Sequence, residues 1–299
     1  MTAVKRIVFI INPVSGTNNK EDIGRKIEEF FKSSSISVTI ENTQKAGDAN
    51  SFALKYSTEK YDAVVAVGGD GTINEVVNGI GMLGVPMGVI PGGSGNGLAR
   101  HLGIPMKFEK AAQIILEGIY QPIDLVKVND RLSVNVSGVG FDALVAQRFQ
   151  NKKKRGLASY IKIVLKEFVN FTAQKYELIV DGKPLVRNAF LISFANSSQF
   201  GNNAYISPMA SICDGYFDLC IVKPFPKLLA PSLIKDLMMG KLDQSKYLEI
   251  FKAKEVILHQ DSEIYHMDGD AMSGFKNLEI KILPSVLNMI IPKNKLNKI

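Results

Sequence analysis

A short apolar run, residues 63–67 (AVVAV), is followed at once by the glycine-rich segment 68–72 (GGDGT). Apolar residues in so short a run predict a buried β-strand, and the glycines after it predict a tight turn. Because glycine has no Cβ atom, a phosphate group can approach the backbone N–H groups of such a turn closely. This part of the chain therefore predicts a strand, a loop and a helix that bind the phosphates of a nucleotide.

The residues after the first two glycines indicate how that helix is expected to begin. Thr72 and Glu75 have the spacing of a capping box, which predicts a helix that starts at Thr72 with its amide end toward the anion. Asp70 lies between glycines, where a carboxylate would repel phosphate unless a metal ion or a proton transfer requires it. We therefore expect Asp70 to be catalytic or linked to a metal. The alternative is a purely structural turn with Thr72 as its cap.

The composition limits the class of protein. Of the 299 residues, 46% are hydrophobic and 22% are charged, which is typical of a globular chain long enough for two domains. Lysine and arginine number 36 against 29 aspartate and glutamate, and the net charge of +7 favours polyanionic partners. No recognition helix or stacking aromatic pattern indicates nucleic acid. Cys213 and Cys220 show no pairing or metal-ligand pattern, so we expect a reduced, cytoplasmic location.

Up to about residue 120, short apolar runs alternate with segments of helical periodicity. This alternation predicts a doubly wound α/β domain, with helices on both faces of a parallel sheet and ligands at the carboxyl ends of the strands. The expected strands are 7–11, 36–40, 63–67 and 87–90, and the expected helices lie near 20–31, 48–56, 72–80 and 107–116.

After Pro122 the pattern changes to paired strands separated by turn dipeptides, which is typical of an antiparallel β-sandwich. We expect an α/β domain over residues 1–122 and a β-sandwich domain over 123–299, whose last residues can pack back on the first. An exposed strand edge could pair with a second copy, so a homodimer stays open. The expected strands are 125–128 paired with 131–134, 176–180 paired with 190–194 across the turn 181–182, and further strands at 256–258 and 278–283.

Three glycine-bearing loops follow strands of the first domain: residues 12–16 (NPVSG), 68–72 and 91–97 (PGGSGNG). In a doubly wound sheet all three can face one crevice. Neither a P-loop nor a dinucleotide-binding glycine pattern after the first strand is present. Phosphate would therefore be held by backbone, hydroxyl groups and Mg²⁺.

These motifs resemble those of the lipid kinases that share the diacylglycerol kinase catalytic domain, which include diacylglycerol, sphingosine and ceramide kinases and bacterial relatives. The resemblance covers nearly the whole chain. It implies an ATP-binding first domain, an active site in the cleft between the two domains, and transfer of the γ-phosphate of ATP to a hydroxyl of a membrane lipid. The motifs are residues 12–13, 68–72, 91–100, 138–142, 214–215 and 268–270, in family order.

The resemblance also implies particular site residues. Asp70 would lie near the ATP phosphates and Mg²⁺. A second, structural Mg²⁺ would be held in the β domain by Asp214 with the backbone carbonyls of Ser211 and Tyr216, although an Asp-Gly β-turn is the alternative interpretation. The ATP-binding residues would be Asn12, Thr43, Gly68, Gly69, Asp70, Gly71, Thr72, Ile73, Asn74 and Ser94.

Asp268 and Asp270 flank a glycine at the position that the resemblance assigns to the acid/base element. A lipid hydroxyl loses its proton as it attacks the γ-phosphoryl group, and a carboxylate is a suitable acceptor. We expect Asp270 to be that acceptor, with Asp268 and Asp70 as the other catalytic candidates. The family usually has Glu at position 270, so the reach of the shorter Asp270 and the division of labour stay open.

The lipid is only partly indicated. The loop containing Ser94 reads Gly-Ser-Gly-Asn-Gly and is more similar to sphingosine and ceramide kinases than to the common bacterial Gly-Thr-x-Asn-Asp form. This favours a sphingoid lipid slightly over diacylglycerol without deciding between them. Two alternatives stay open: an NAD kinase, which also carries a Gly-Gly-Asp-Gly loop, and a catalytically weakened protein that binds a nucleotide or a lipid.

Two segments could associate with a membrane surface. A basic cluster at 152–155 (KKKR) precedes the amphipathic segment 157–172, and a second amphipathic segment spans 228–242. No run approaches the roughly 18 apolar residues of a membrane span, so we expect peripheral association with an anionic surface. Core packing is the alternative for both segments. His101, His259 and His266 have no metal-ligand spacing and are expected to be structural or surface residues.

Overall fold

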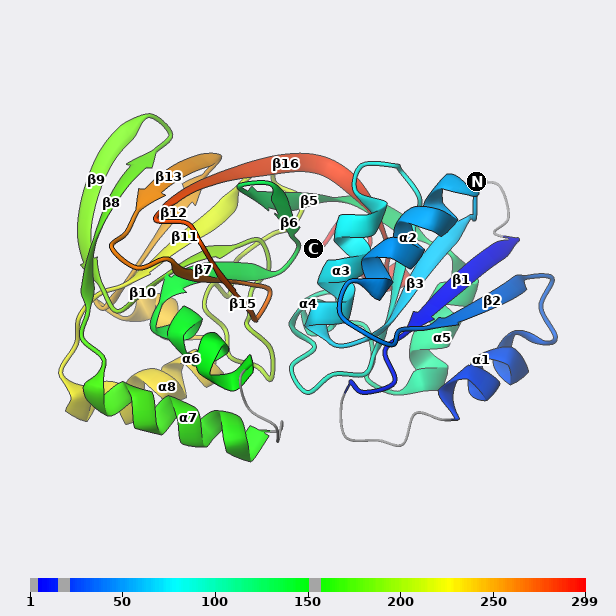
Figure 1. Cartoon of the computed structure of the whole chain (residues 1–299), viewed down its shortest axis with the longest axis horizontal. Coiled ribbons are helices and arrows are strands. Elements are labelled where there is room, and N and C mark those ends of the chain that lie inside the picture. The colour runs from blue at the N-terminus through cyan, green and yellow to red at the C-terminus, as the bar shows by residue number, and fades with distance from the viewer. Residues whose placement is uncertain (1–4, 16–21, 151–156) are drawn as a thin grey trace. The chain divides into compact units, whose positions relative to one another are not determined.

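The computed structural model describes residues 5–15, 22–150 and 157–299. The chain divides into two compact units: residues 1–123 with 285–299 form unit 1, and residues 124–284 form unit 2 (Figure 1). The basic cluster predicted at 152–155 lies outside the described residues.

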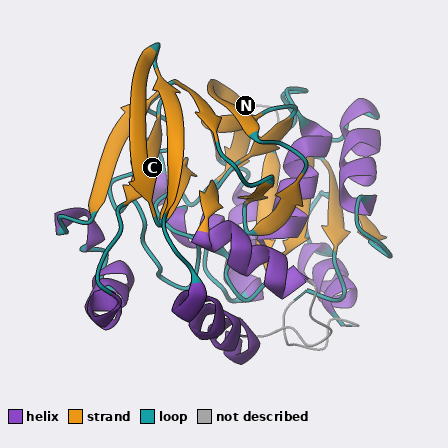
Figure 2. Ribbon diagram, turned by 60° about the vertical axis from the view of Figure 1, so that its left-hand side comes forward, coloured by secondary structure: helices purple, strands orange, loops and turns teal. Residues whose placement is uncertain are grey.

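Unit 1 contains a parallel sheet with the strand order β2-β1-β3-β4, and the carboxyl end of β16 lies parallel to β4. The helices α2 and α3 pack together on one face, and α1 and α5 on the other (Figures 1 and 2). The bounds are β1 (Arg6–Ile11), α1 (Ile23–Phe31), β2 (Ser37–Asn42), α2 (Asp48–Thr58), β3 (Ala63–Gly68), α3 (Asp70–Ile80), β4 (Met87–Pro91), α4 (Gly97–His101), α5 (Phe108–Glu117), β16 (Asn277–Ile290) and the 3₁₀ turn η3 (Lys293–Lys295).

Helices cover both faces of this sheet, so its central strands are apolar throughout. Every residue of β3 is buried, and so is every residue of β1 after Arg6. The short helix α4 was not expected from the pattern. These strands and helices confirm the doubly wound α/β prediction.

Unit 2 is a sandwich of two sheets. In its described part, β12-β11-β10-β7-β14-β15 form a six-stranded antiparallel sheet, and β16-β13-β8-β9 form the facing one, beside the β5–β6 hairpin. The bounds are β5 (Tyr120–Val128), β6 (Arg131–Ser133), β7 (Val136–Gly140), α6 (Phe141–Gln150), α7 (Leu157–Asn170), β8 (Gln174–Val180), β9 (Lys183–Ala189), β10 (Leu191–Ala195), β11 (Phe217–Val222), the 3₁₀ turn η1 (Lys227–Leu229), α8 (Ala230–Met238), the 3₁₀ turn η2 (Leu242–Gln244), β12 (Leu248–Ala253), β13 (Glu255–His259), β14 (Ile264–Met267) and β15 (Asp270–Ser273).

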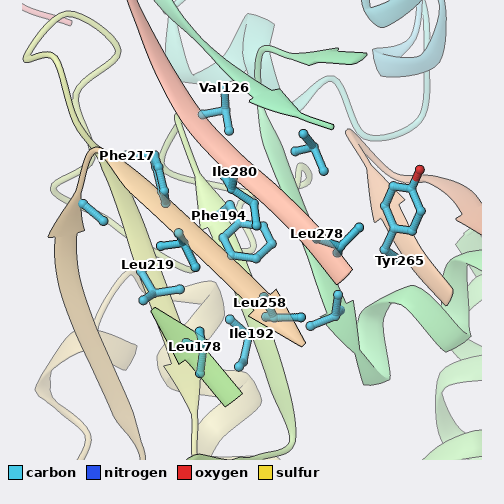
Figure 3. Packing of buried hydrophobic residues seen from close by; sticks show 14 of the residues in the cluster. Val126, Leu178, Ile192, Phe194, Phe217, Leu219, Leu258, Tyr265, Leu278 and Ile280 are labelled. Carbon is cyan, nitrogen blue, oxygen red and sulfur yellow. The ribbon is translucent and has the colours of Figure 1, made fainter. Parts of the chain in front are cut away.

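The two sheets of unit 2 enclose one apolar core (Figure 3). Phe194 and Phe217 from the six-stranded sheet meet Leu258 and Ile280 from the facing sheet, and all four are buried. The strands β13 and β16 alternate buried and exposed residues, as expected when one face of a sheet is solvated. The β-sandwich prediction is therefore confirmed.

One strand pairing was predicted wrongly. Strand β8 does pair across the turn at Asp181 and Gly182, but its partner is β9, with Ile179 opposite Pro184. The segment expected as its partner is β10, which lies in the other sheet between β11 and β7. Strand β9 (KPLVRNA) is largely exposed and carries polar residues, so its apolar signal was too weak to identify it.

Candidate active site

In unit 1, the loops after β1 and β3 are joined by side chains. The Asn12 amide Nδ2 donates to the Thr72 hydroxyl over 3.1 Å, and the Asn12 backbone N–H donates to Val67 over 3.0 Å. The Asn12 carbonyl and amide oxygens also accept hydrogen bonds from Ser15 and Val14, which hold the loop after β1. The first two predicted loops therefore converge.

The loops after β3 and β4 touch through glycines. The Gly92 N–H donates to the Gly68 carbonyl over 2.7 Å, and a Cβ atom on Gly93 would lie 2.5 Å from the Cα atom of Gly69. No side chain larger than hydrogen fits between these backbones. The result is bare backbone at the carboxyl ends of neighbouring parallel strands, which suits an anionic ligand.

Helix α3 begins earlier than the capping-box prediction. Its N-cap is Gly69 and its first residue is Asp70, and no side chain caps it. The Thr72 hydroxyl instead accepts from Asn12, and the Glu75 carboxylate accepts from the N–H groups of Gly47 and Ala49 at the start of α2. The capping-box prediction was wrong because these tertiary partners engage both side chains.

Asn96 closes the loop after β4, and sequence reasoning missed it. Its amide accepts from the Gly93 N–H over 2.9 Å and donates to the Gly93 carbonyl over 2.8 Å. Asn96 is buried in the left-handed backbone region, with φ 50° and ψ 47°, which asparagine tolerates better than most residues. Ser94 is consequently left exposed at the tip of the loop.

The other predicted ATP-binding residues differ in what they can offer a ligand. The Thr43 N–H donates to Ile11, which places Thr43 just beyond β2 beside the end of β1. Asp70, in the first turn of α3, and Asn74, just after it, are half-buried. Ile73 is fully buried, so only its backbone could contribute to binding.

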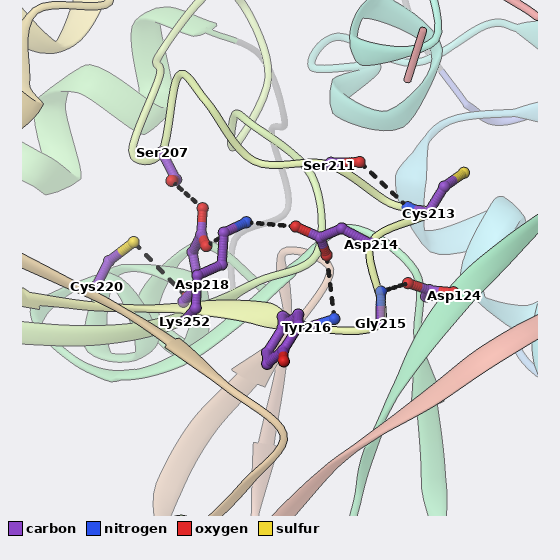
Figure 4. A network of polar contacts seen from close by, with 10 residues as sticks. All are labelled: Asp124, Ser207, Ser211, Cys213, Asp214, Gly215, Tyr216, Asp218, Cys220 and Lys252. Atoms are coloured by element: carbon purple, nitrogen blue, oxygen red, sulfur yellow. Dashed lines mark hydrogen bonds and ion pairs between the residues drawn. The ribbon is translucent and has the colours of Figure 1, made fainter. Parts of the chain in front are cut away.

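In unit 2, Asp214 is part of a charged network (Figure 4). The Lys252 Nζ lies 2.7 Å from an Asp214 oxygen and 2.9 Å from an oxygen of Asp218, its cross-strand neighbour, which is 2% exposed. The Tyr216 N–H donates to the other Asp214 oxygen, and the Ser207 hydroxyl donates to Asp218. Burial disfavours the Lys252 charge, but the two carboxylates outweigh it and raise the Lys252 pKa.

In this network Lys252 is the cation beside Asp214, and the Mg²⁺ site expected there stays a prediction. Both Asp214 oxygens already have partners, and the Lys252 ammonium supplies a positive charge where a metal was predicted with Ser211 and Tyr216. The described residues contain no group of three His, Cys, Asp or Glu side chains that could hold a metal ion. The Gly215 N–H donates to buried Asp124, which supports the Asp-Gly turn.

Asp268 and Asp270 lie at the tip of the β14–β15 hairpin, in different surroundings. Asp268 and Gly269, both with positive φ, form the two-residue turn between paired Met267 and Asp270. The Asp268 carboxylate is 4% exposed and faces the loop between β6 and β7, whereas Asp270 is exposed. The two aspartates that flank Gly269 therefore differ: Asp268 is buried and Asp270 is exposed.

The motif at 138–142 supports the same hairpin. Asp142, in the first turn of α6, lies 3.0 Å from the ring Nε2 of His266 and accepts from the Ser193 hydroxyl over 3.3 Å. A Cβ atom on Gly138 would lie 2.5 Å from the Ile192 carbonyl oxygen, so glycine is needed there for close packing.

Comparisons with known proteins agree with this architecture. The sequence-family model for the diacylglycerol kinase catalytic domain matches residues 6–128. The family model for the YegS C-terminal NAD kinase beta sandwich-like domain matches residues 135–291. A diacylglycerol kinase of Bacillus subtilis is 29% identical over 98% of both chains. One from Staphylococcus aureus is 32% identical over 73% of this chain and 71% of its own. A crystal structure of a Bacillus anthracis diacylglycerol kinase has a TM-score of 0.77 at 22% identity, covering 98% of this chain and 99% of its own. The chain belongs to the diacylglycerol kinase and YegS family of lipid kinases.

Within the described part of the chain, none of the helices has both the length and the apolar character needed to cross a membrane.

Proposed function

We propose that this protein transfers the γ-phosphoryl group of ATP to a hydroxyl of a membrane lipid, either diacylglycerol or a sphingoid base. The main support is the contact of Gly69 with Gly93 at the amino end of α3. Backbone without Cβ atoms beside a helix N-terminus is suited to the phosphates of a nucleotide. Asn12, Thr43 and Ser94, which lie in the loops after β1, β2 and β4, would contact the rest of the nucleotide.

The charge of the phosphates is met partly by the chain itself. The N-terminus of an α-helix carries a partial positive charge, and α3 directs its first N–H groups away from the helix at Gly69 and Asp70. Mg²⁺ would neutralise further phosphate charge, and the Asp70 carboxylate at this position would hold it. Thr72, held by Asn12, keeps the loop after β3 in place.

The proton step is assigned to Asp270. The lipid hydroxyl oxygen forms a bond to the γ-phosphorus, the bond from that phosphorus to the ADP oxygen breaks, and the hydroxyl proton passes to the Asp270 carboxylate. Asp270 is exposed at the start of β15, so its carboxylate is accessible to a substrate.

We also propose that unit 2 docks on an anionic lipid surface in the cytoplasm. Helix α7 carries an exposed apolar stripe, Ile161, Leu165 and Val169, at a spacing of four residues. Exposed Lys162 and Lys166 lie beside this stripe. An apolar stripe flanked by cations is the pattern of a helix that lies in a membrane interface.

The segment of η1 and α8 has the same character and lies along the same edge of unit 2 as α7 (Figure 1). Leu228 is 93% exposed, and exposed Ile234 is followed by exposed Lys235. The Lys227 ammonium donates to the Val169 carbonyl, which joins η1 to the end of α7. Together these helices present an apolar, basic surface that favours an anionic bilayer.

The test is transfer of ³²P from γ-labelled ATP to diacylglycerol, sphingosine, ceramide and NAD, with the lipids in mixed micelles and Mg²⁺ present. We expect a labelled lipid with the wild-type protein and at least roughly 10²-fold slower labelling with Asp70→Asn or Asp270→Asn. Label on NAD would identify an NAD kinase instead. ATP binding without any labelled product would indicate a nucleotide-binding protein that has lost catalysis.

A further inference from the structure

The Asp268 carboxylate is held by the loop between β6 and β7. One of its oxygens accepts from the Ser133 hydroxyl over 2.6 Å and from the Asn135 N–H over 2.9 Å, and the other accepts from the Val134 N–H over 3.0 Å. The Asp268 backbone N–H adds a bond to Val136 over 3.1 Å. Burial and these three donors hold the Asp268 carboxylate in place, and moving it toward a lipid hydroxyl would break the bonds.

The loop that holds Asp268 is itself held by buried polar groups. The Ser137 hydroxyl donates to the Ser133 hydroxyl over 2.7 Å, and the Ser197 hydroxyl donates to the Asn135 side chain. The Asn196 amide donates to the Val134 carbonyl over 3.0 Å. Because each residue of the loop has a partner behind it, the loop forms a rigid support for the hairpin.

Strand β14 is anchored on both faces before the turn. Tyr265 and Met267 point into the apolar core, while His266, on the opposite face, pairs with Asp142. Asp268 then ties the turn to the loop between β6 and β7. Asp270 is the first residue of β15 and pairs with Met267. The hairpin tip that carries it is therefore fixed by the apolar core, by Asp142 and by the loop between β6 and β7.

We propose that Asp268 is a positioning residue that sets the place of the Asp270 carboxylate and does not take the substrate proton itself. This rests on the proposed function. It assigns the division of labour between the two aspartates: Asp270 exchanges the proton, and Asp268 holds the hairpin that carries it. A displacement of about 1 Å in a catalytic group can lower a rate by roughly 10²-fold, so anchoring of this kind affects turnover directly.

The molecule contains a matched control for this anchor. Asp181 and Gly182 form another Asp-Gly turn with positive φ, between β8 and β9. The Asp181 carboxylate accepts from the N–H groups of Lys254 and Glu255 over 3.0 and 2.9 Å. Asp181→Asn therefore removes the same charge from the same kind of turn, away from Asp270.

The activity test compares Asp268→Asn, Ser133→Ala, Asp270→Asn and Asp181→Asn. We expect Asp268→Asn to lower kcat on the order of 10²-fold, with the KM for ATP and the acid limb of the kcat profile against pH retained. Ser133→Ala, which removes one of three bonds, should lower kcat less, and Asp181→Asn should not change it. Asp270→Asn should abolish the acid limb. The proposal is overturned if Asp268→Asn abolishes the limb while Asp270→Asn keeps it, or if Asp268→Asn leaves kcat unchanged.

A second readout does not depend on activity. Hydrogen exchange of the backbone amides of residues 264–273 should be faster in Asp268→Asn and Ser133→Ala than in the wild type, and unchanged in Asp181→Asn. Unchanged exchange in both Asp268→Asn and Ser133→Ala would show that Asp268 does not hold the hairpin tip and would overturn the inference. Absence of lipid phosphorylation by the wild type, with the expected exchange pattern, would reject the proposed function and leave the anchor supported.

Discussion

Gly93 and Gly69 meet backbone to backbone, so closely that a Cβ atom on Gly93 would lie 2.5 Å from the Gly69 Cα. The same atom would lie 3.0 Å from the Oδ1 of Asn96, which closes the loop. Two loops that follow different strands are thus kept together by the absence of side chains.

Gly93→Ala should force these loops apart. Overpacking of this kind costs about 1–3 kcal/mol, and we expect the free energy of unfolding to fall by that amount and ATP affinity to fall with it. Chemical denaturation and calorimetric titration with ATP would measure both. Gly24→Ala, in helix α1, is the control, because a Cβ atom there would meet only the Ile40 side chain, at an ordinary contact distance of 3.7 Å. Equal effects of the two variants would contradict the prediction.

Lys252→Met should leave the buried Asp218 carboxylate without its cation. Because Lys252 is 44% exposed, solvent screening reduces the expected loss of unfolding free energy to about 1–2 kcal/mol. Lys254→Met, which removes an ammonium 4.9 Å above the Tyr216 ring, should cost less. Denaturant titration would measure the order of the two.

The same network makes a prediction about metal. Since Lys252 already supplies a positive charge to Asp214, the thermal midpoint of the wild-type protein should be the same in excess Mg²⁺ and in EDTA. Differential scanning calorimetry without nucleotide tests this. A midpoint that rises with Mg²⁺ and that loses this response in Asp214→Asn would instead support the metal site predicted from Ser211, Asp214 and Tyr216.

The stability of the protein should decrease in mild acid because of His101. Burial, and then the charge of Lys295, lower the His101 pKa from 6.5 to about 4. Below pH 6.5 His101 binds a proton in the unfolded chain but stays neutral in the folded chain. The free energy of unfolding therefore decreases progressively as the pH falls toward 4. The loss amounts to about 2–3 kcal/mol. Denaturant unfolding at several pH values should show a shallower decrease in His101→Gln than in the exposed control His259→Gln.

Leu165→Asp and Ile234→Asp should each weaken binding to vesicles that contain an anionic phospholipid. Removing one large apolar side chain from a membrane contact costs about 1.5–3 kcal/mol, which corresponds to roughly ten-fold or more in affinity. Cosedimentation with vesicles at low and high salt would measure the effect. Val186→Asp changes an exposed apolar residue on strand β9 and should bind like the wild type. Equal losses in all three variants would argue against a surface made of α7 and α8.

The parallel strands β1 to β4 could be predicted to within one or two residues, whereas β16, expected at 278–283, spans Asn277–Ile290. Strand β3 was expected at 63–67 and spans Ala63–Gly68, and β2 was expected at 36–40 and spans Ser37–Asn42. Buried parallel strands give continuous apolar runs, and the glycines after them mark their ends. Local pattern and local structure agree there because each strand is identified by its own residues.

The partners of individual side chains could not be predicted in this way. Lys252 meets Asp218 only because β11 and β12 pair in one particular register. Asp268 receives its hydrogen bonds from Ser133 and its neighbours, far earlier in the chain. Register and loop packing depend on the whole fold, so no local signal separates the buried Asp268 from the exposed Asp270.

The path of the chain through unit 1 has a consequence for synthesis. Strand β4 has β3 on one side and the carboxyl end of β16 on the other, where Met289 lies opposite Met87. During translation, the ribosome adds residues 285–299 only after all of unit 2 has been made. The loops after β1 and β3 can therefore form early, but the sheet beneath them keeps an open edge at β4 until residues 285–299 emerge. A fragment ending at residue 123 would retain that edge permanently and would be prone to associate through it.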